Sequence, residues 1–371
     1  MYAKLRLFTL CSGVWLVISI YPMEAQLLKD TAVLNLVKKD IDYIYNLQFV
    51  EARDLYSDII TAYPEHPVVY LLRGMITYWE NFPLLNTNPA KASFEEDLRK
   101  CIKISEENSN PDHEAEYLLA NLCSRGFLLM FYSDNDLVME VIPLATSTYK
   151  YLRHSFNFTS ECADLYYFTG MYNYYRDAYP KAYPVYKPLT VLFPAGDMET
   201  GIKELNIAAA QSIVLRAESS YLLTYIYVNF ENDFLQAFKY SRPLHEYYPE
   251  NVHFLAVYLR NLLLLKRYDE ADQLIGSLPE ESANRYFQAQ LNIFKGLLME
   301  KKYLDNKTAQ QYYNKGISDI SLYGDYADEF SSYGYFGLSR ISDANGEKHA
   351  SKMYRKEALR LADFKKLNFD K

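Results

Sequence analysis

The chain has 371 residues, more than one compact core usually holds, and half of them are apolar. Its 39 Lys and Arg against 47 Asp and Glu give a net charge of −8, which argues against a generic nucleic-acid binder, because that function needs a basic surface. Only 13 Gly and 14 Pro are present, too few for a large all-β fold, whereas Tyr is abundant at 37 residues.

Residues 1–25 have the pattern of a secretory signal peptide. Lys4 and Arg6 give a positive start, and residues 7–21 form an uncharged apolar stretch of about 15 residues, too short to cross a bilayer core of ~30 Å. Leu10 stands before Cys11 where a lipobox requires a small residue. We expect cleavage and export to the periplasm or cell envelope, with an uncleaved anchor helix as the alternative. No later apolar run reaches ~18 residues, so no stable membrane insertion is expected after cleavage.

Three cysteines remain beyond this leader: Cys101, Cys123 and Cys162. They lie on separate predicted helices without metal-ligand spacing, so no zinc site is predicted. Two interpretations of Cys101 and Cys123 stay open. They pair in the oxidising compartment, or they are small buried core residues.

From Leu27 onward, apolar residues recur at three- and four-residue spacing in segments of about 12–20 residues. These segments are broken by Pro, Asn, Asp or Gly, as in helical hairpins. Ala52 is followed by Pro64 at the same spacing that separates Ala237 from Pro249. Ala271 follows Ala237 after about 34 residues, which indicates an internal repeat of that length.

This pattern resembles the tetratricopeptide repeat (TPR), in which the second helix of each hairpin carries Ala, an aromatic residue four positions later, and Pro after the helix. The pairs that carry the resemblance are Ala52/Tyr56, Ala90/Phe94, Ala145/Tyr149, Ala309/Tyr313 and Ala350/Tyr354, with Tyr70/Gly74, Tyr166/Gly170 and Tyr333/Gly337 on first helices. The spacing between these positions varies, so the repeats are degenerate. The resemblance implies an all-α fold, a right-handed α-solenoid of about eight antiparallel hairpins. Residues 26–178 and 198–371 form its two parts.

The segment between them, residues 179–197, departs from the repeat. It contains Pro180, Pro184, Pro188 and Pro194, so an ordinary helix is not expected, and Asp197 is predicted to cap the next helix. Its aromatic residues are Tyr179, Tyr183 and Tyr186, which form a sticky surface if exposed. A binding excursion and a proline-stiffened connector are both compatible with this composition.

No catalytic motif is found. The sequence has no phosphate-binding glycine loop, no G-x-S-x-G elbow and no H-E-x-x-H pair. His245, Glu246 and His253 come closest to a metal cluster, but they fall on different predicted helices and are interpreted as surface residues. We therefore expect no cofactor, no metal and no enzymatic activity.

The TPR resemblance implies a concave groove lined by first helices, through residues one, four and five positions after the small Gly. Transferred to this chain, the predicted groove residues are Met75, Tyr78, Trp79, Tyr167, Met171, Tyr174, Tyr175, Asn229, His253 and Arg260. Inter-helix packing is the competing interpretation for the tyrosines. Tyr166 is expected to pack inward, so that Tyr167, Tyr174 or Tyr175 points elsewhere.

These observations favour a non-catalytic scaffold of the bacterial cell envelope that binds a protein or peptide, and no nucleic acid. A rigid groove lined by tyrosines loses little entropy on binding and offers large contact areas. An envelope glycan-binding protein similar to the SusD-like proteins is the alternative, although this chain is shorter and lacks their lipobox cysteine. An α-helical enzyme with a site near the Pro-rich segment is the remaining one.

Overall fold

The structure is a computed structural model of the chain, and it describes residues 30–185, 187–188, 193–362 and 369. The expected signal peptide at residues 1–25 and the predicted site residue Tyr186 lie outside the described residues.

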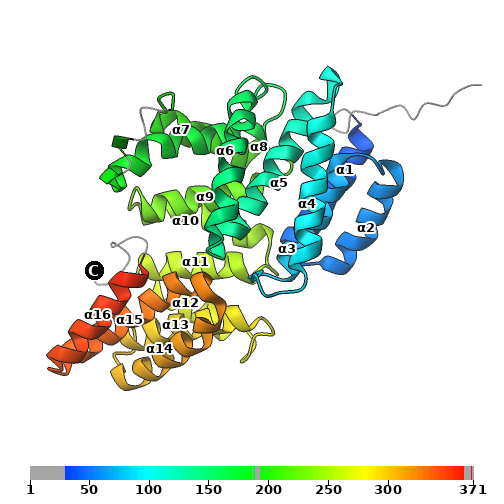
Figure 1. Ribbon diagram of the computed structural model, residues 1–371. Coiled ribbons are helices and arrows are strands. Elements are labelled where there is room, and N and C mark those ends of the chain that lie inside the picture. Colours follow the sequence, from blue (N-terminus) through cyan, green and yellow to red (C-terminus); the bar gives the residue numbers. More distant parts are fainter. Residues whose placement is uncertain (1–29, 186, 189–192, 363–368, 370–371) are drawn as a thin grey trace, which may run out of the picture.

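The described part is all α-helical, as predicted, and Figure 1 shows its elements. The α-helices are α1 (Thr31–Tyr45), α2 (Phe49–Ala62), α3 (Pro67–Glu80), α4 (Lys91–Glu107), α5 (Glu114–Asp134), α6 (Val138–Ser155), α7 (Leu165–Ala182), α8 (Met198–Gln211), α9 (Arg216–Asn229), α10 (Phe234–Tyr247), α11 (Val252–Leu264), α12 (Tyr268–Gly276), α13 (Arg285–Lys301), α14 (Asn306–Ile320), α15 (Asp328–Ala344) and α16 (Lys348–Leu361). Two 3₁₀ helices, η1 (Pro111–His113) and η3 (Ser321–Ala327), precede α5 and α15.

Several helices begin at a short polar residue whose side chain accepts a hydrogen bond from a free backbone N–H of the first turn. Asp30 does this for α1, Asn251 for α11 and Asn284 for α13. The predicted cap Asp197 is confirmed, because its carboxylate accepts from the Thr200 backbone N–H at 2.7 Å. These caps fix where the helices start and so the register of each pair.

Helices that follow one another in the chain pack side by side, as α3 with α4, α7 with α8, α13 with α14 and α15 with α16. Odd-numbered helices also contact the next odd-numbered helix, as α1 with α3, α3 with α5, α11 with α13, and α13 with α15. The odd-numbered helices thus form a continuous layer at both ends of the chain.

Small residues allow the close packing between these helices. Ala52, Ala237, Ala271 and Ala309, which belong to the repeat pattern, are all completely buried. On α15, a Cβ atom added to Gly337 would come within 2.3 Å of the Tyr313 ring on α14. A side chain larger than hydrogen therefore cannot occupy Gly337 unless the Tyr313 ring moves.

The repeat pattern misleads in α6. Ala145 was expected at a close helix crossing, but it is exposed, and Ser155 is the one fully buried residue among those of α6. Pro143 lies inside the helix. Helix α6 continues past it because the carbonyl that Pro143 leaves unbonded, that of the exposed Met139, can bond to water.

The start of the Pro-rich segment is also more helical than predicted. Helix α7 runs through Tyr179 and Pro180 and ends at Ala182, where the backbone N–H of Tyr183 donates to the Tyr179 carbonyl at 2.8 Å. A proline in the last turn removes only its own backbone hydrogen bond, so the helix tolerates it two residues before its end.

Candidate functional site

The two halves of the chain touch through side chains along a contact that we call the seam, between α1 and the segment from α9 to α11. The Tyr45 hydroxyl donates to Glu218 at 3.0 Å, and the Asn251 side-chain amide donates to the Tyr45 carbonyl at 2.7 Å. The Tyr248 hydroxyl donates to Asp42 at 3.1 Å. The seam therefore joins residues that lie about half the chain apart in the sequence.

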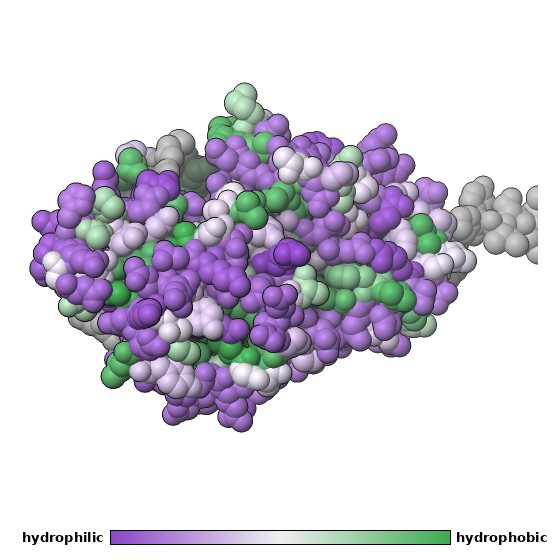
Figure 2. All heavy atoms as spheres, turned by 90° about the horizontal axis from the view of Figure 1, so that it is seen from below, coloured by the Kyte–Doolittle hydropathy of each residue, from purple (hydrophilic) through white to green (hydrophobic). Residues whose placement is uncertain are grey.

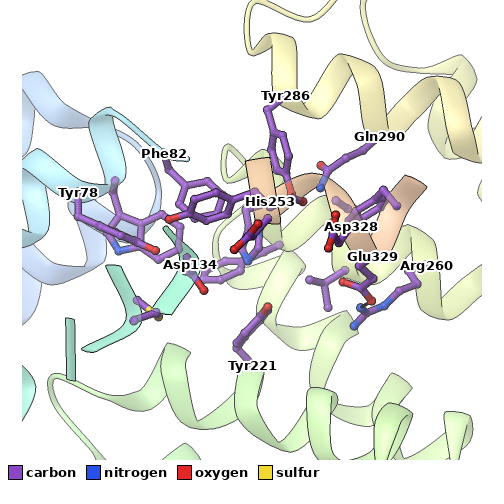
Figure 3. A pocket seen from close by; sticks show the side chains of 18 of the residues that line it. Tyr78, Phe82, Asp134, Tyr221, His253, Arg260, Tyr286, Gln290, Asp328 and Glu329 are labelled. Carbon is purple, nitrogen blue, oxygen red and sulfur yellow. Dashed lines mark hydrogen bonds and ion pairs between the residues drawn. The ribbon is translucent and has the colours of Figure 1, made fainter. Parts of the chain in front are cut away.

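A pocket of about 220 Å³ opens beside the seam, and we call it the central pocket. Its lining comes from α3, α5, α9, α11, α13, η3 and α15. Figure 3 shows side chains from these elements pointing toward one another around a shared space. The α-helices that contribute are all odd-numbered: α3 and α5 belong to the layer at the start of the chain, α11, α13 and α15 to the layer at its end, and α9 lies between them in the sequence.

Aromatic rings make up much of the wall. Phe82, in the loop after α3, packs against both large hydrophobic clusters of the described chain. Its ring lies 4.9 Å from the His253 ring, 6.2 Å from Tyr286 and 5.8 Å from Tyr326, all edge-on. The Tyr286 hydroxyl donates to the Tyr326 carbonyl at 2.7 Å, which ties α13 to η3 across the pocket. The indole N–H of Trp79 has no hydrogen-bond partner in the described part of the chain.

Two carboxyl groups of the central pocket have strongly perturbed acidity. Burial raises the pKa of Glu218 to about 7, and the hydrogen bond from Tyr45 offsets only part of this effect. Burial also raises the pKa of Asp134 to about 7; the Tyr326 hydroxyl opposes this shift and the neighbouring Asp325 charge adds to it. Desolvation without a compensating positive charge is thus the dominant influence on both groups.

The pocket contains one arginine, and that arginine is already paired. Arg260, only 4% exposed, forms an ion pair with Glu329 at 2.5 Å, and the same carboxylate accepts a hydrogen bond from the Tyr333 hydroxyl. Burial, followed by the Arg260 charge, lowers the pKa of the nearby His253 to about 4. His253 is therefore neutral near pH 7 and adds no positive charge.

The structure brings four of the predicted groove residues together: Tyr78, Trp79, His253 and Arg260 all line the central pocket. His253 is not the surface residue expected from the sequence, because its half-buried ring packs against Phe82 and Trp79 in the pocket wall. Figure 3 shows Tyr78 and Arg260 on opposite sides of the site, with His253 between them.

Other predicted groove residues belong to the interior. Met75 and Tyr174 are completely buried, Asn229 is 6% exposed, and none of the three lines the central pocket. Tyr174 packs against Tyr175 and Phe230, and its hydroxyl donates to Glu231. Helix α8 packs against α7, which carries Tyr174. The spacing transferred from the repeat says which residues share a face of α7, but not that α8 packs against this helix.

The remaining predicted residues on α7 are half-buried or lie toward its end. Tyr167 and Met171 pack against the hydrophobic cluster of the first helices, and Tyr175 packs against that of α7 to α9. The pKa of Tyr167 is raised by burial first and then by the charge of Glu218, which places Tyr167 within electrostatic reach of the pocket. Tyr179 is exposed, and its ring lies tilted against that of Tyr183 with the ring centroids 4.9 Å apart; neither residue lines the central pocket.

Sequence reasoning missed the carboxyl groups of the pocket and most of its aromatic wall. The missed lining residues that matter most are Phe82, Asp134, Glu218, Tyr221, Tyr286, Tyr326 and Glu329. Glu218 carries a detectable signal, a single acidic residue among the apolar and small residues of α9. Apart from Tyr221, which lies inside α9, the others come from helix ends and loops, where the repeat register gives no orientation.

The described residues contain no group of three or more His, Cys, Asp or Glu that could hold a metal ion. Cys101, Cys123 and Cys162 are free and buried, so the core interpretation of the cysteines holds in this structure. Within the same residues, no helix has both the length and the apolar character required to cross a bilayer.

The fold and the site together define an all-α protein of paired helices with an aromatic and acidic pocket. No protein-family model matches the chain. A search of curated proteins found no relative with significant similarity. The geometry of the central pocket is therefore the best indication of function in this molecule.

Proposed function

We propose that this protein is a TPR-like right-handed α-solenoid of about eight hairpins, exported to the bacterial cell envelope, that binds a protein or peptide without catalysis. The pairing of neighbouring helices and the complete burial of the repeat alanines support the solenoid. The signal-like residues 1–25 support export.

One observation carries the binding function: every α-helix that lines the central pocket is odd-numbered, and the odd-numbered helices are the first helices of the proposed hairpins. A repeat protein uses this surface for ligands because it is concave and preformed. The pocket volume of about 220 Å³ suits one anchoring side chain rather than a whole peptide. The face shown in Figure 2 is mostly hydrophilic with separate apolar patches, which gives a competing apolar interface little support on that side.

Site-specific photocrosslinking tests this proposal. A benzoylphenylalanine replaces Tyr326, which lines the pocket, and in a matched control it replaces Leu235, which is 61% exposed on α10. Irradiation in the native envelope should give a discrete protein or peptide adduct from position 326 that is absent from position 235. The same adducts at both positions, or none at 326, would refute a pocket-mediated partner.

An envelope glycan-binding protein similar to the SusD-like proteins is the second candidate. A lining that combines aromatic rings, such as those of Phe82 and Tyr286, with carboxylates, such as that of Glu329, also suits the apolar faces and hydroxyl groups of a sugar. Affinity electrophoresis through common polysaccharides discriminates between the candidates. Unchanged mobility in all of them would exclude the glycan candidate.

An α-helical enzyme is the third candidate. The pKa values of about 7 at Asp134 and Glu218 match those of a general acid or base. A panel of chromogenic glycosides and esters tests for activity, and hydrolysis that disappears in Glu218→Gln would favour it.

A further inference from the structure

We propose that the central pocket binds a cation, the ammonium or guanidinium group of a lysine or arginine side chain that the partner inserts. This proposal rests on the peptide-binding function proposed above and specifies the chemistry of its anchor. Its basis is the set of charged side chains that line the pocket.

The central pocket has an excess of acidic groups. Its lining includes the carboxyl groups of Asp134, Glu218, Asp325, Asp328 and Glu329, against the single guanidinium of Arg260. Arg260 is occupied by its ion pair with Glu329. Within the part of the chain that the structure describes, Asp134, Glu218 and Asp325 form no ion pair.

These acidic groups come from separate elements and converge. Asp134 ends α5, Glu218 lies in the first turn of α9, and Asp325 belongs to η3. Helix packing alone does not require three carboxyl groups to line one cavity, and their placement costs free energy through the desolvation of Asp134 and Glu218 and the repulsion between Asp134 and Asp325. An entering positive charge removes that cost, because it supplies the counter-charge that the described chain lacks.

The aromatic walls of the central pocket favour a cation, as its carboxyl groups do. An ammonium or guanidinium group is attracted to the face of an aromatic ring, most strongly to Trp. Trp79, Phe82, Tyr221 and Tyr286 line the same pocket as the three unpaired carboxyl groups. In Figure 3, Tyr78 and Phe82 lie on the side of Asp134, away from Arg260, so a cation there avoids the existing positive charge.

The shape favours a side chain over a large ligand. The volume of about 220 Å³ accommodates an extended alkyl stem with a charged end, and the aromatic walls contact the stem. The partner's anchor is thus an amphipathic basic side chain, whose apolar stem and charged tip match the two components of the lining.

Tryptophan fluorescence gives a direct test, because the chain has only two Trp, at positions 15 and 79. In a Trp15→Phe background, Trp79 in the pocket wall becomes the single reporter. The probes are the blocked tripeptides Ac-Gly-Lys-Gly-NH₂ and Ac-Gly-Arg-Gly-NH₂, with Ac-Gly-norleucine-Gly-NH₂ as an uncharged control of similar length. Butylamine represents a free amine.

The lysine and arginine peptides should change Trp79 emission saturably and bind at least about 10-fold more tightly than the norleucine peptide, because only they bring a positive charge to the unpaired carboxyl groups. Glu218→Gln, which keeps a side-chain oxygen for the hydrogen bond from Tyr45, should weaken their binding about 5-fold or more. Asp325→Asn, at an exposed residue, should weaken it in the same direction. Glu140→Gln, on the exposed surface of α6, is the matched control and should have no effect.

Equal binding of the norleucine peptide, or unchanged affinity in both acidic variants, would overturn the cation proposal. If butylamine binds as tightly as the lysine peptide, the claim that the cation is a side chain of the partner is overturned in favour of a free amine. Absence of any fluorescence response combined with a specific crosslink from position 326 would refute the cation and leave the proposed function standing. Absence of both would refute the two proposals together.

Discussion

Replacing Asp40 with Asn should make the folded state more stable at neutral pH, although it removes a charged group from a protein rich in charges. Asp40 lies on α1, is completely buried, and neither of its carboxyl oxygens has a hydrogen-bond partner in the described part of the chain. Burial raises its pKa from 3.8 to about 8. The carboxyl group is therefore mostly protonated in the folded protein at neutral pH and ionised in the unfolded chain.

The magnitude follows from this difference between the two states. The pKa of Asp40 is higher in the folded state than in the unfolded chain. The contribution of this carboxyl group to the free energy of unfolding is therefore complete below about pH 4 and is lost as the pH rises to about 8. One pKa unit corresponds to ~1.4 kcal/mol, so the loss reaches about 4 kcal/mol at pH 7. Asn has nearly the same shape and stays neutral at every pH. The advantage of Asp40→Asn should therefore be small near pH 4 and grow to about 4 kcal/mol at pH 7.

Hydrogen exchange measured by mass spectrometry gives the local free energy of opening of α1 across this pH range, and urea unfolding followed by circular dichroism gives the global value. Asp54→Asn, at an exposed residue of α2, is the matched control and should show no such pH dependence. A constant difference between Asp40→Asn and the parent from pH 4 to pH 8 would refute the reasoning, because it would mean that Asp40 ionises as in water.

Two further substitutions test the packing of helices. Gly337→Ala should lower the free energy of unfolding by about 1–3 kcal/mol, because the added Cβ would overlap the Tyr313 ring. The control Gly126→Ala, whose Cβ would have nothing within 4 Å, should be neutral or stabilising. Thermal unfolding compares the two variants, and equal shifts in the unfolding temperature would refute the clash. Asp164→Ala should lower the free energy of unfolding by about 3 kcal/mol or more, because the Asp164 carboxylate accepts hydrogen bonds from the backbone N–H groups of residues 213–215 at 2.7–3.0 Å. A free energy from denaturant unfolding that stays within ~1 kcal/mol of the parent would contradict this.

The sequence was sufficient to predict the helical fold because its strongest signals are local. The alanines at the repeat positions, such as Ala237 and Ala271, are fully buried, as close packing of paired helices requires. Ala145 fits the same short pattern but is exposed, because no helix of the described residues buries that position of α6. A spacing of four residues predicts which residues share a face, but not what that face contacts.

The site could be predicted only in part, for a related reason. Tyr78 and Trp79 were found because their positions relative to Gly74 are local. The carboxyl groups of Asp134 and Glu218 lie on different helices, and their proximity depends on how the whole chain curves. Composition and spacing contain no information on that curvature, so the acidic character of the pocket appears only in three dimensions.

The seam has a consequence for how the molecule unfolds. In an open repeat array each unit contacts only its neighbours, so the ends fray and stability adds unit by unit. Here Asn251 binds the Tyr45 carbonyl and Tyr248 binds Asp42, so the first helix holds the middle of the chain. These contacts close a loop of about 200 residues, so α1 is held by residues of the middle of the chain as well as by its neighbouring helices. Loss of α1 would expose the partners of Tyr45 at the N-terminus of α11 and leave Glu218 without its tyrosine hydroxyl, so truncation at one end of the sequence would be felt at the centre.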